Sequence, residues 1–304
     1  MKINWQGVFP AISTQFHDDG SINFASNATM LEALIDEGID GIIALGTVGE
    51  NASLSAEEKR AFIEHTVATV KGRITVIAGC TENTARAAAQ YVNDLEPLGI
   101  DGIMLLPAVV YRGTDKEVLA HYQYVARSTR LPIMIYNNPV SYGVDIDLDM
   151  TAILAAEPNI VAIKESSTDT RRITELQSRF GDRFTIFCGV DDIALESMLL
   201  GATGWISGLT NVFPRESVAL YQLARAGRIE EAREIYRWFM PLLRLDTIPT
   251  LVQCIKLAEQ MLERGSENVR LPRLPLEGEE RAYVERTVNT ALSQRIDLSK
   301  FNLN

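Results

Sequence analysis

Short apolar runs alternate with longer amphipathic segments along almost the whole chain, at a spacing of roughly 25–30 residues. The apolar runs predict strands at residues 7–14, 41–46, 74–79, 102–107, 132–137, 160–164, 184–189 and 204–209. The segments between them predict helices at residues 24–38, from 55, 84–98, from 115, 147–156, 170–180, 192–200 and 214–225. Ser55 and Glu58 form a capping box, which marks the start of the second helix.

Strands that alternate with helices favour a parallel sheet covered by helices, and this series predicts an α/β protein with a (β/α)8 TIM barrel over residues 1–226. The competing architecture is an open, doubly wound sheet. It is disfavoured because Gly46-Thr47-Val48-Gly49 is not a dinucleotide fingerprint and no acidic residue ends the next strand. About three further amphipathic helices in residues 227–304 predict a C-terminal helical extension.

Composition narrows the classes of partner and compartment. The chain has 304 residues, of which 46% are hydrophobic, so it can bury a large core. Its net charge of −11 disfavours nucleic acid and anionic membranes as partners. The first residues lack the apolar core of a signal peptide, so we expect a cytoplasmic protein. The three cysteines and three histidines match no metal-binding spacing, and we expect no metal, nucleotide or flavin cofactor.

The sixth predicted strand carries the chemistry that organises the rest of the site. Ile160-Val161-Ala162-Ile163 is a buried strand pattern that ends in Lys164. A buried lysine either pairs with a carboxylate or loses its proton, because an isolated ammonium is costly to bury. The neutral amine is a nucleophile for carbonyl carbon, whereas a lysine that emerges at the strand end and forms an ion pair has only a structural role. The strand alone leaves both readings open.

In a TIM barrel the active site lies at the carboxyl ends of the strands, so residues there are candidates. The candidates for catalysis are Lys164 and Tyr136, and the candidates for substrate binding are Gly46, Thr47, Val48, Gly189, Asp191, Ile206 and Ser207. Together they offer an amine for a carbonyl group, amides and hydroxyls for a carboxylate, and a phenol that moves protons. We therefore expect a small-molecule 2-oxo acid as substrate.

Three motifs at this barrel mouth resemble one known family. Gly46-Thr47-Val48-Gly49-Glu50, Tyr136-Asn137-Asn138-Pro139 and Lys164-Glu165 resemble the dihydrodipicolinate synthase/N-acetylneuraminate lyase family, and the resemblance extends over essentially the whole chain. It implies a class I, Schiff-base-forming lyase of pyruvate-like acids that assembles as a homotetramer, a dimer of dimers. It also implies that Lys164 forms the imine, that Tyr136 shuttles protons, and that Thr47 and the Val48 amide hold the carboxylate.

Two departures from the family pattern bear on the substrate. Synthases of this family resemble one another in a tyrosine pair after the fourth-strand proline, one of which completes a proton relay across the dimer. Here Pro107 is followed by Ala108-Val109-Val110, and Tyr111 and Arg112 come later. The synthases also carry an arginine for a second carboxylate where this chain has Ser141. The departures argue against the synthase, although a loop shift would allow Tyr111 or Arg112 to substitute.

Residues 136–144 and 236–243 resemble Δ1-pyrroline-4-hydroxy-2-carboxylate deaminases of hydroxyproline breakdown. This resemblance implies that Lys164 opens a cyclic imino acid substrate and that the products are ammonia and 2-oxoglutarate semialdehyde. We take this deaminase as the expected activity. The alternatives are a 2-keto-3-deoxy sugar-acid aldolase or dehydratase, a 4-hydroxy-tetrahydrodipicolinate synthase, or a non-catalytic barrel that binds a keto acid.

Several candidates also have a purely structural interpretation. Tyr136 is of a type that commonly lines barrels, and Thr47 suits a turn at a helix entrance. Asp191 either caps the following helix, as does Asp192, or contacts a substrate hydroxyl. Tyr111 either packs at a subunit interface or serves the relay. Only the positions of these side chains in space distinguish the two sets of roles.

Overall fold

The computed structural model describes residues 3–108 and 110–303, so Val109 in the stretch after Pro107 lies outside it. Parallel strands form one sheet in the order β1-β8-β7-β6-β5-β4-β3-β2. Their bounds are β1 Gly7–Pro10, β2 Gly41–Ala44, β3 Thr75–Cys80, β4 Gly102–Leu105, β5 Ile133–Asn137, β6 Ile160–Glu165, β7 Thr185–Cys188 and β8 Gly204–Ser207. Ala11 bridges Ile43 in parallel and closes the sheet between β1 and β2, which confirms the (β/α)8 barrel.

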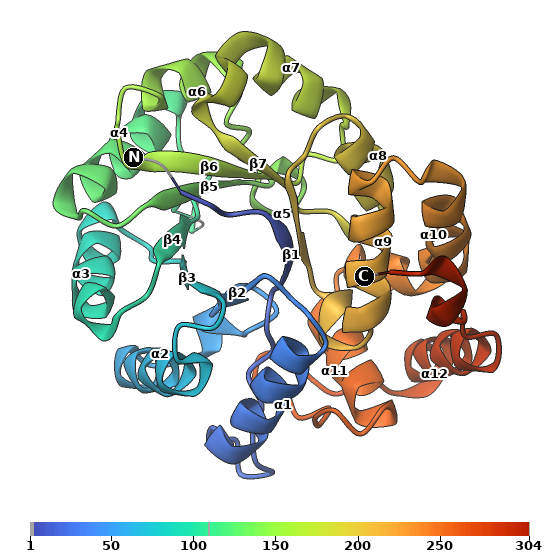
Figure 1. Cartoon of the computed structure of the whole chain (residues 1–304). Coiled ribbons are helices and arrows are strands. Elements are labelled where there is room, and N and C mark those ends of the chain that lie inside the picture. The colour runs from blue at the N-terminus through green and yellow to red at the C-terminus, as the bar shows by residue number, and fades with distance from the viewer. Residues whose placement is uncertain (1–2, 109, 304) are drawn as a thin grey trace.

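Helices surround the strands on the outside of the barrel (Figure 1). Those within the repeating units are α1 Phe24–Asp36, α2 Ala56–Val70, α3 Ala85–Leu95, α4 Asp115–Ser128, α5 Pro139–Tyr142, α6 Leu148–Leu154, α7 Arg171–Phe180, α8 Ala194–Leu199 and α9 Pro214–Arg225. The predicted capping box is confirmed, since the Glu58 amide donates to Ser55 Oγ at 3.2 Å and the Ser55 amide donates to Glu58 Oε2 at 2.9 Å. The short helix α5 was not predicted.

The strands are buried because helices cover the outside of the barrel and side chains fill its inside. Every residue of β6 is buried, including its charged end. Phe9 of β1 and Phe187 of β7 meet edge to face with ring centroids 5.1 Å apart, and neither is exposed. Such packing fixes the strand ends in place, and with them the residues that they carry to the barrel mouth.

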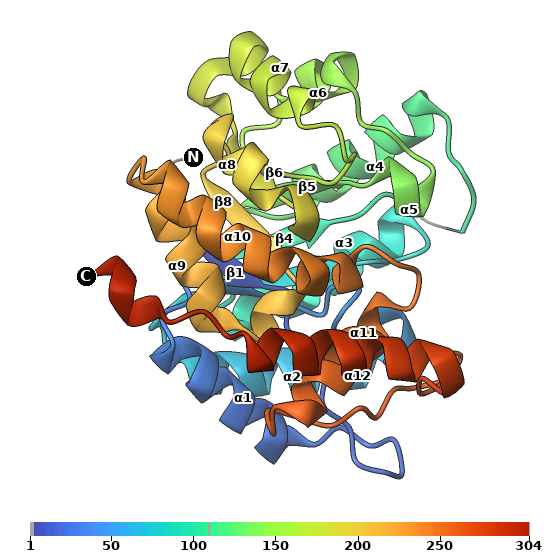
Figure 2. The same ribbon diagram turned by 90° about the vertical axis from the view of Figure 1, so that its right-hand side faces the viewer.

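Three helices follow the last barrel helix: α10 Ile229–Leu243, α11 Leu251–Met261 and α12 Gly278–Ser293. Figure 2 shows α10, α11 and α12 together on one side of the barrel. A buried ion pair connects this region to the mouth, because Lys256 Nζ of α11 lies 2.9 Å from Glu50 Oε1 and donates to the Thr14 carbonyl at 2.8 Å. The C-terminal region therefore helps to hold the loop that follows β2.

Among residues 3–108 and 110–303, the structure contains no helix with the length and apolar character needed to cross a membrane.

Candidate active site

Lys164 and Tyr136 lie side by side at the barrel mouth because their strands are paired. In the parallel register of β5 and β6, Tyr136 is the partner of Lys164. Lys164 Nζ lies 4.1 Å from the centroid of the Tyr136 ring, over its face. Lys164 is only 7% exposed and Tyr136 only 6%, so the lysine does not emerge into solvent at the strand end. The amine therefore sits in a closed, poorly solvated environment beside a phenol.

Burial lowers the pKa of Lys164 below its usual value. Asp246, Tyr142 and Asp191 oppose that shift, because the ionised form of each would raise the pKa of Lys164. A lowered pKa increases the fraction of neutral amine near neutral pH, which is the form that attacks a carbonyl carbon. The site is thus suited to imine formation.

The Tyr136 hydroxyl accepts a hydrogen bond from Asn138 Nδ2 at 3.0 Å. Burial raises the pKa of Tyr136, so its phenol stays protonated at neutral pH. Asn138 also caps the short helix α5, since its Oδ1 accepts from the Ser141 amide at 2.9 Å. One side chain therefore orients the phenol and fixes the turn that follows it.

That turn brings a second phenol to the mouth. The Tyr142 ring meets the Tyr136 ring edge to face with centroids 5.6 Å apart, and the two hydroxyls of Tyr142 and Thr47 lie 2.8 Å from each other. Thr47 follows β2, whereas Tyr142 follows β5, so this hydrogen bond crosses the mouth of the barrel. Gly46 and Val48 flank Thr47 in the same loop, and both are buried. Burial also raises the pKa of Tyr142.

Asp191 lies on the other side of the lysine and is fully buried. Its carboxyl oxygens accept from Trp205 Nε1 at 2.9 Å, from Ser207 Oγ at 2.9 Å and from the Leu209 amide at 3.1 Å. It is therefore bonded to β8 and the turn after it, and it is not a helix cap. Burial raises its pKa to about 6, although these three hydrogen bonds lower it.

A second carboxyl joins Asp191 from the C-terminal region. Asp246 ends the 3₁₀ helix η6, Arg244–Asp246, and its Oδ1 would be only 2.3 Å from a Cβ atom placed on Gly208. Burial raises the pKa of Asp246 well above its usual value, and the neighbouring charge of Asp191 raises it further. Two adjacent carboxyls in a poorly solvated site retain a proton, because ionising both is costly. A proton donor thus lies beside the lysine.

The remaining predicted residues have varied positions. Gly189 packs so closely on the lysine that an added Cβ would be 2.6 Å from Lys164 Cε and 2.1 Å from Ser166 Oγ. Ile206 and Ser207 are buried in β8. Tyr111 is 57% exposed, and its hydroxyl is 3.4 Å from Glu117 Oε1 at the start of α4. In a single chain Tyr111 therefore lies apart from the hydroxyls near Lys164.

Sequence reasoning missed Tyr142 and Asp246. Tyr142 lies in a four-residue helix, which is too short to have a periodic signal. The residue types Asn138 and Gly143 were turn signals in the sequence, and in the structure Asn138 caps the helix and Gly143 ends it at φ +69°. Asp246 comes from the C-terminal region by tertiary packing, and no local pattern marks it.

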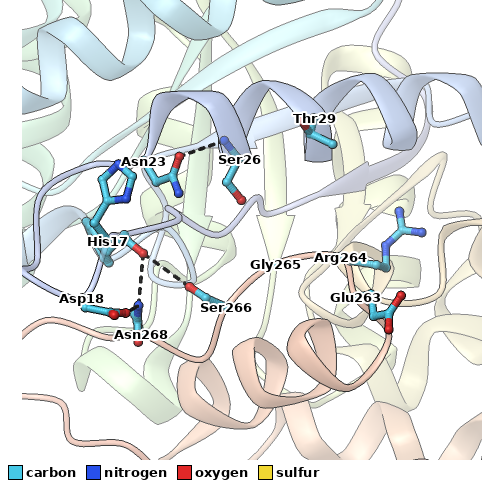
Figure 3. Close-up of a pocket in the computed structure, with 11 residues that line it drawn as sticks. His17, Asp18, Asn23, Ser26, Thr29, Glu263, Arg264, Gly265, Ser266 and Asn268 are labelled. Atoms are coloured by element: carbon cyan, nitrogen blue, oxygen red, sulfur yellow. Dashed lines mark hydrogen bonds between the residues drawn. The ribbon is translucent and has the colours of Figure 1, made fainter.

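The structure also has a hollow at a separate place, between the loop after β1 and residues 263–268 (Figure 3). Several of its polar groups are paired with other groups of the chain. The Phe16 carbonyl accepts from Asn268 Nδ2 at 3.2 Å, and Asn23 Oδ1 accepts from the Ser26 amide at 3.0 Å. None of the residues around this hollow belongs to the lysine site, so the chemistry remains at the strand ends.

Comparison with known proteins agrees with the motifs. Residues 4–291 match the model of the dihydrodipicolinate synthetase family. The 4-hydroxy-tetrahydrodipicolinate synthase 1 of Halalkalibacterium halodurans is 32% identical over 93% of this chain and 96% of its own length. The 4-hydroxy-tetrahydrodipicolinate synthase of Aquifex aeolicus is 35% identical over 88% of this chain and 91% of its own length.

Solved structures show the same likeness. The 4-hydroxy-tetrahydrodipicolinate synthase of Methylacidiphilum fumariolicum SolV has a TM-score of 0.91 and 32% identity, and the alignment covers 96% of this chain and 98% of that chain. A dihydrodipicolinate synthase from Acinetobacter baumannii, complexed with pyruvate, has a TM-score of 0.89 and 30% identity, with coverage of 94% and 98%.

These findings correct the expected activity. The deaminase prediction is wrong, because similar proteins over nearly the whole chain are 4-hydroxy-tetrahydrodipicolinate synthases. Part of the misleading likeness, residues 236–243, has a packing role: the Tyr236 hydroxyl is 2.7 Å from Glu196 Oε2 and so ties α10 to α8. The absence of the family tyrosine pair and arginine therefore did not exclude the synthase.

Proposed function

Because the chain belongs to the dihydrodipicolinate synthetase family of class I lyases, we propose that it catalyses the reaction named in its relatives, the formation of 4-hydroxy-tetrahydrodipicolinate. The observation that carries this proposal is the buried Lys164 amine 4.1 Å above the Tyr136 ring, with the Thr47 and Tyr142 hydroxyls beside it. An amine of lowered pKa next to protonated phenols suits imine chemistry on a 2-oxo acid.

The substrates follow from the atoms of the product. The product has seven carbons in all, five of them with one nitrogen in a six-membered ring and the other two in carboxylates. Pyruvate, which the Acinetobacter relative binds, supplies three carbons and one carboxylate. The second substrate must supply four carbons, an amine, a carboxylate and an aldehyde, which describes aspartate 4-semialdehyde. The sum of these two molecules minus one water gives the product.

In this scheme Lys164 Nζ attacks C2 of pyruvate, and the carbinolamine loses water to give the imine. Tyr136 assists the removal of a proton from C3, which gives the enamine. The enamine carbon attacks the aldehyde carbon, and the aldehyde oxygen takes a proton to become the 4-hydroxyl group. The amine of the second substrate then attacks C2, closes the ring and releases Lys164. Thr47 and the Val48 amide hold the pyruvate carboxylate.

The second carboxylate requires a cation that Ser141 does not supply. Arg112 Cδ lies 4.0 Å from the position that a Cβ atom on Gly143 would occupy, so the arginine side chain passes the end of α5 next to Tyr142. We assign the second carboxylate to Arg112. Replacement by alanine is expected to raise the KM for aspartate 4-semialdehyde while the KM for pyruvate stays within about twofold, since only one of the two substrates loses a partner.

The proposal is tested by incubating the enzyme with pyruvate and aspartate 4-semialdehyde and measuring the product by mass spectrometry. Lys164→Ala is the inactive variant, and Lys116→Ala, an exposed lysine of α4, is the matched control. We expect product from the native chain and the control but not from Lys164→Ala. If the native chain forms a pyruvate adduct but no product, the synthase activity is refuted and the imine lysine stands.

We further propose that the enzyme is a cytoplasmic homotetramer, as the family resemblance implied. Exposed apolar side chains near the barrel mouth support contact with another copy: Val140 of α5 is 71% exposed and Val110 is 69% exposed. Light scattering of the purified protein tests the assembly, with a mass of four chains expected and a monomer as the contrary result.

A further inference from the structure

Tyr136, Tyr142 and Thr47 form a series of contacting residues that starts next to the reactive amine. Tyr136 is in contact with Lys164 Nζ through its ring, and Tyr142 packs edge to face on Tyr136 with an angle of 83° between the rings. The Tyr142 hydroxyl then lies 2.8 Å from Thr47 Oγ1. The three residues come from three segments of the same chain, which the barrel closure brings together.

The position of Tyr142 is fixed by its local structure. Asn138 caps the first turn of α5 through the Ser141 amide, and Gly143 ends it in the left-handed region at φ +69°. Between the two, Tyr142 has little freedom to point elsewhere. The local structure thus holds the Tyr142 hydroxyl at a hydrogen bond across the barrel mouth, and such a fixed position is typical of residues that take part in function.

Imine chemistry needs a path for protons at this place. A proton leaves C3 of the imine and must later return, and Tyr136 is the nearest phenol. Tyr136 is only 6% exposed, so it exchanges protons poorly with water on its own. Tyr142 is half-buried and stands between Tyr136 and Thr47, so it provides the next hydroxyl on the way to solvent.

We propose that Tyr142 is a proton-relay residue of the Lys164 site, so that one chain completes the hydroxyl series without a residue from a second copy. This inference rests on the proposed imine function but not on the identity of the second substrate. In each transfer one hydroxyl gives its proton as it receives another, so no net charge is left on the relay. Tyr111, the other tyrosine near this region, instead has its hydroxyl 3.4 Å from Glu117 on α4.

The test measures deprotonation at C3 directly. In heavy water, enzyme-bound pyruvate exchanges its methyl protons for deuterium, and nuclear magnetic resonance follows the rate without a second substrate. Tyr142→Phe keeps the ring and removes only the hydroxyl, and Tyr124→Phe, a 53% exposed tyrosine of α4, is the matched control. We expect Tyr142→Phe to slow the exchange about 100-fold, within the range of general acid–base effects. Trapping of the pyruvate adduct with borohydride should stay within about twofold of the native level.

Separate outcomes contradict the relay and the proposed function. Exchange at the native rate in Tyr142→Phe would refute the relay, and an equal loss in Tyr111→Phe would refute its completion within one chain. Absence of any trapped adduct in the native protein would instead refute the proposed function. If Tyr142→Phe unfolds, the comparison of Thr47→Val with Thr47→Ser repeats the test. The serine variant should exchange the C3 protons at the native rate, and the valine variant should exchange them more slowly.

Discussion

The buried ion pair between Glu50 and Lys256 offers the sharpest test of how the C-terminal region supports the site. Glu50 closes the motif that contains Thr47, and its φ of +53° is unusual for a residue with a side chain. Both side chains of the pair are fully buried, and the Lys256 ammonium also lies 4.5 Å from the Phe16 ring. We expect Lys256→Met to destabilise the fold and to loosen the loop after β2.

The loss of stability expected for Lys256→Met depends on the partners that Glu50 keeps. Breaking a buried pair by removing one member costs roughly 3–5 kcal/mol, because a charge is left without compensation. Glu50 keeps the Arg270 amide at 3.0 Å and Arg273 Nη1 at 3.9 Å, which places the expected cost near the lower end, about 3 kcal/mol. Because native proteins are stable by only about 5–15 kcal/mol, this loss is easily measured.

The assay is urea unfolding of Glu50→Gln, Lys256→Met and the double variant. The double variant leaves no unpaired charge, so its cost should be about 2 kcal/mol or more below the sum of the two single costs. Lys300→Met removes the exposed ion pair with Glu234 and should change stability by less than about 1 kcal/mol. Additive costs in the buried pair, or a cost of Lys256→Met equal to that of the surface control, would refute this reasoning.

Two further predictions concern the residues around the lysine. Burial raises the pKa of Asp191 to about 6, so the protonated carboxyl favours the folded state. Protonation therefore adds up to about 3 kcal/mol to the free energy of unfolding at low pH, and this stabilisation is lost as the pH rises through 6. Asp191→Asn should therefore lower the free energy of unfolding by urea more near pH 4 than near pH 8. A loss of stability that does not depend on pH would contradict the raised pKa of Asp191. Gly189→Ala would place Cβ 2.6 Å from Lys164 Cε, and the displaced amine should trap pyruvate about 100-fold more slowly. Gly113→Ala, where the added Cβ meets its nearest atom at 3.5 Å, is the control, and equal trapping rates in the two variants would refute the steric argument.

Much of the barrel could be predicted because each unit has a strong local signal. The run that ends in Lys164 and the capping box of Ser55 and Glu58 depend only on neighbouring residues, and both appear in the structure. Strand ends were predicted less well. The first strand was expected to reach residue 14 but ends at Pro10; beyond it Ala11 forms an isolated bridge with Ile43, and the Ile12 amide donates to the Ile43 carbonyl at 3.0 Å. Residues 11–14 are all buried at the barrel mouth, so their burial alone did not mark where the strand ends.

The site could be predicted only where strand ends supply it. Lys164, Tyr136 and Thr47 follow from the rule that such ends meet at one face of a barrel. Tyr142 and Asp246 depend on a short capped turn and on the packing of the C-terminal region, neither of which has a periodic pattern. The predicted substrate was wrong because it depended on single positions such as Ser141, which do not show what other segments of the chain bring to the barrel mouth.

Whether Lys164 is the reactive residue is tested by reduction of the enzyme with borohydride in the presence of pyruvate, followed by peptide mass spectrometry. A buried amine whose pKa burial lowers should form an imine, and reduction makes that bond permanent. We expect the mass of one reduced pyruvate on the peptide that contains Lys164 and none in Lys164→Ala. An adduct on another lysine, or none in the native protein, would contradict the assignment of Lys164 as the reactive residue.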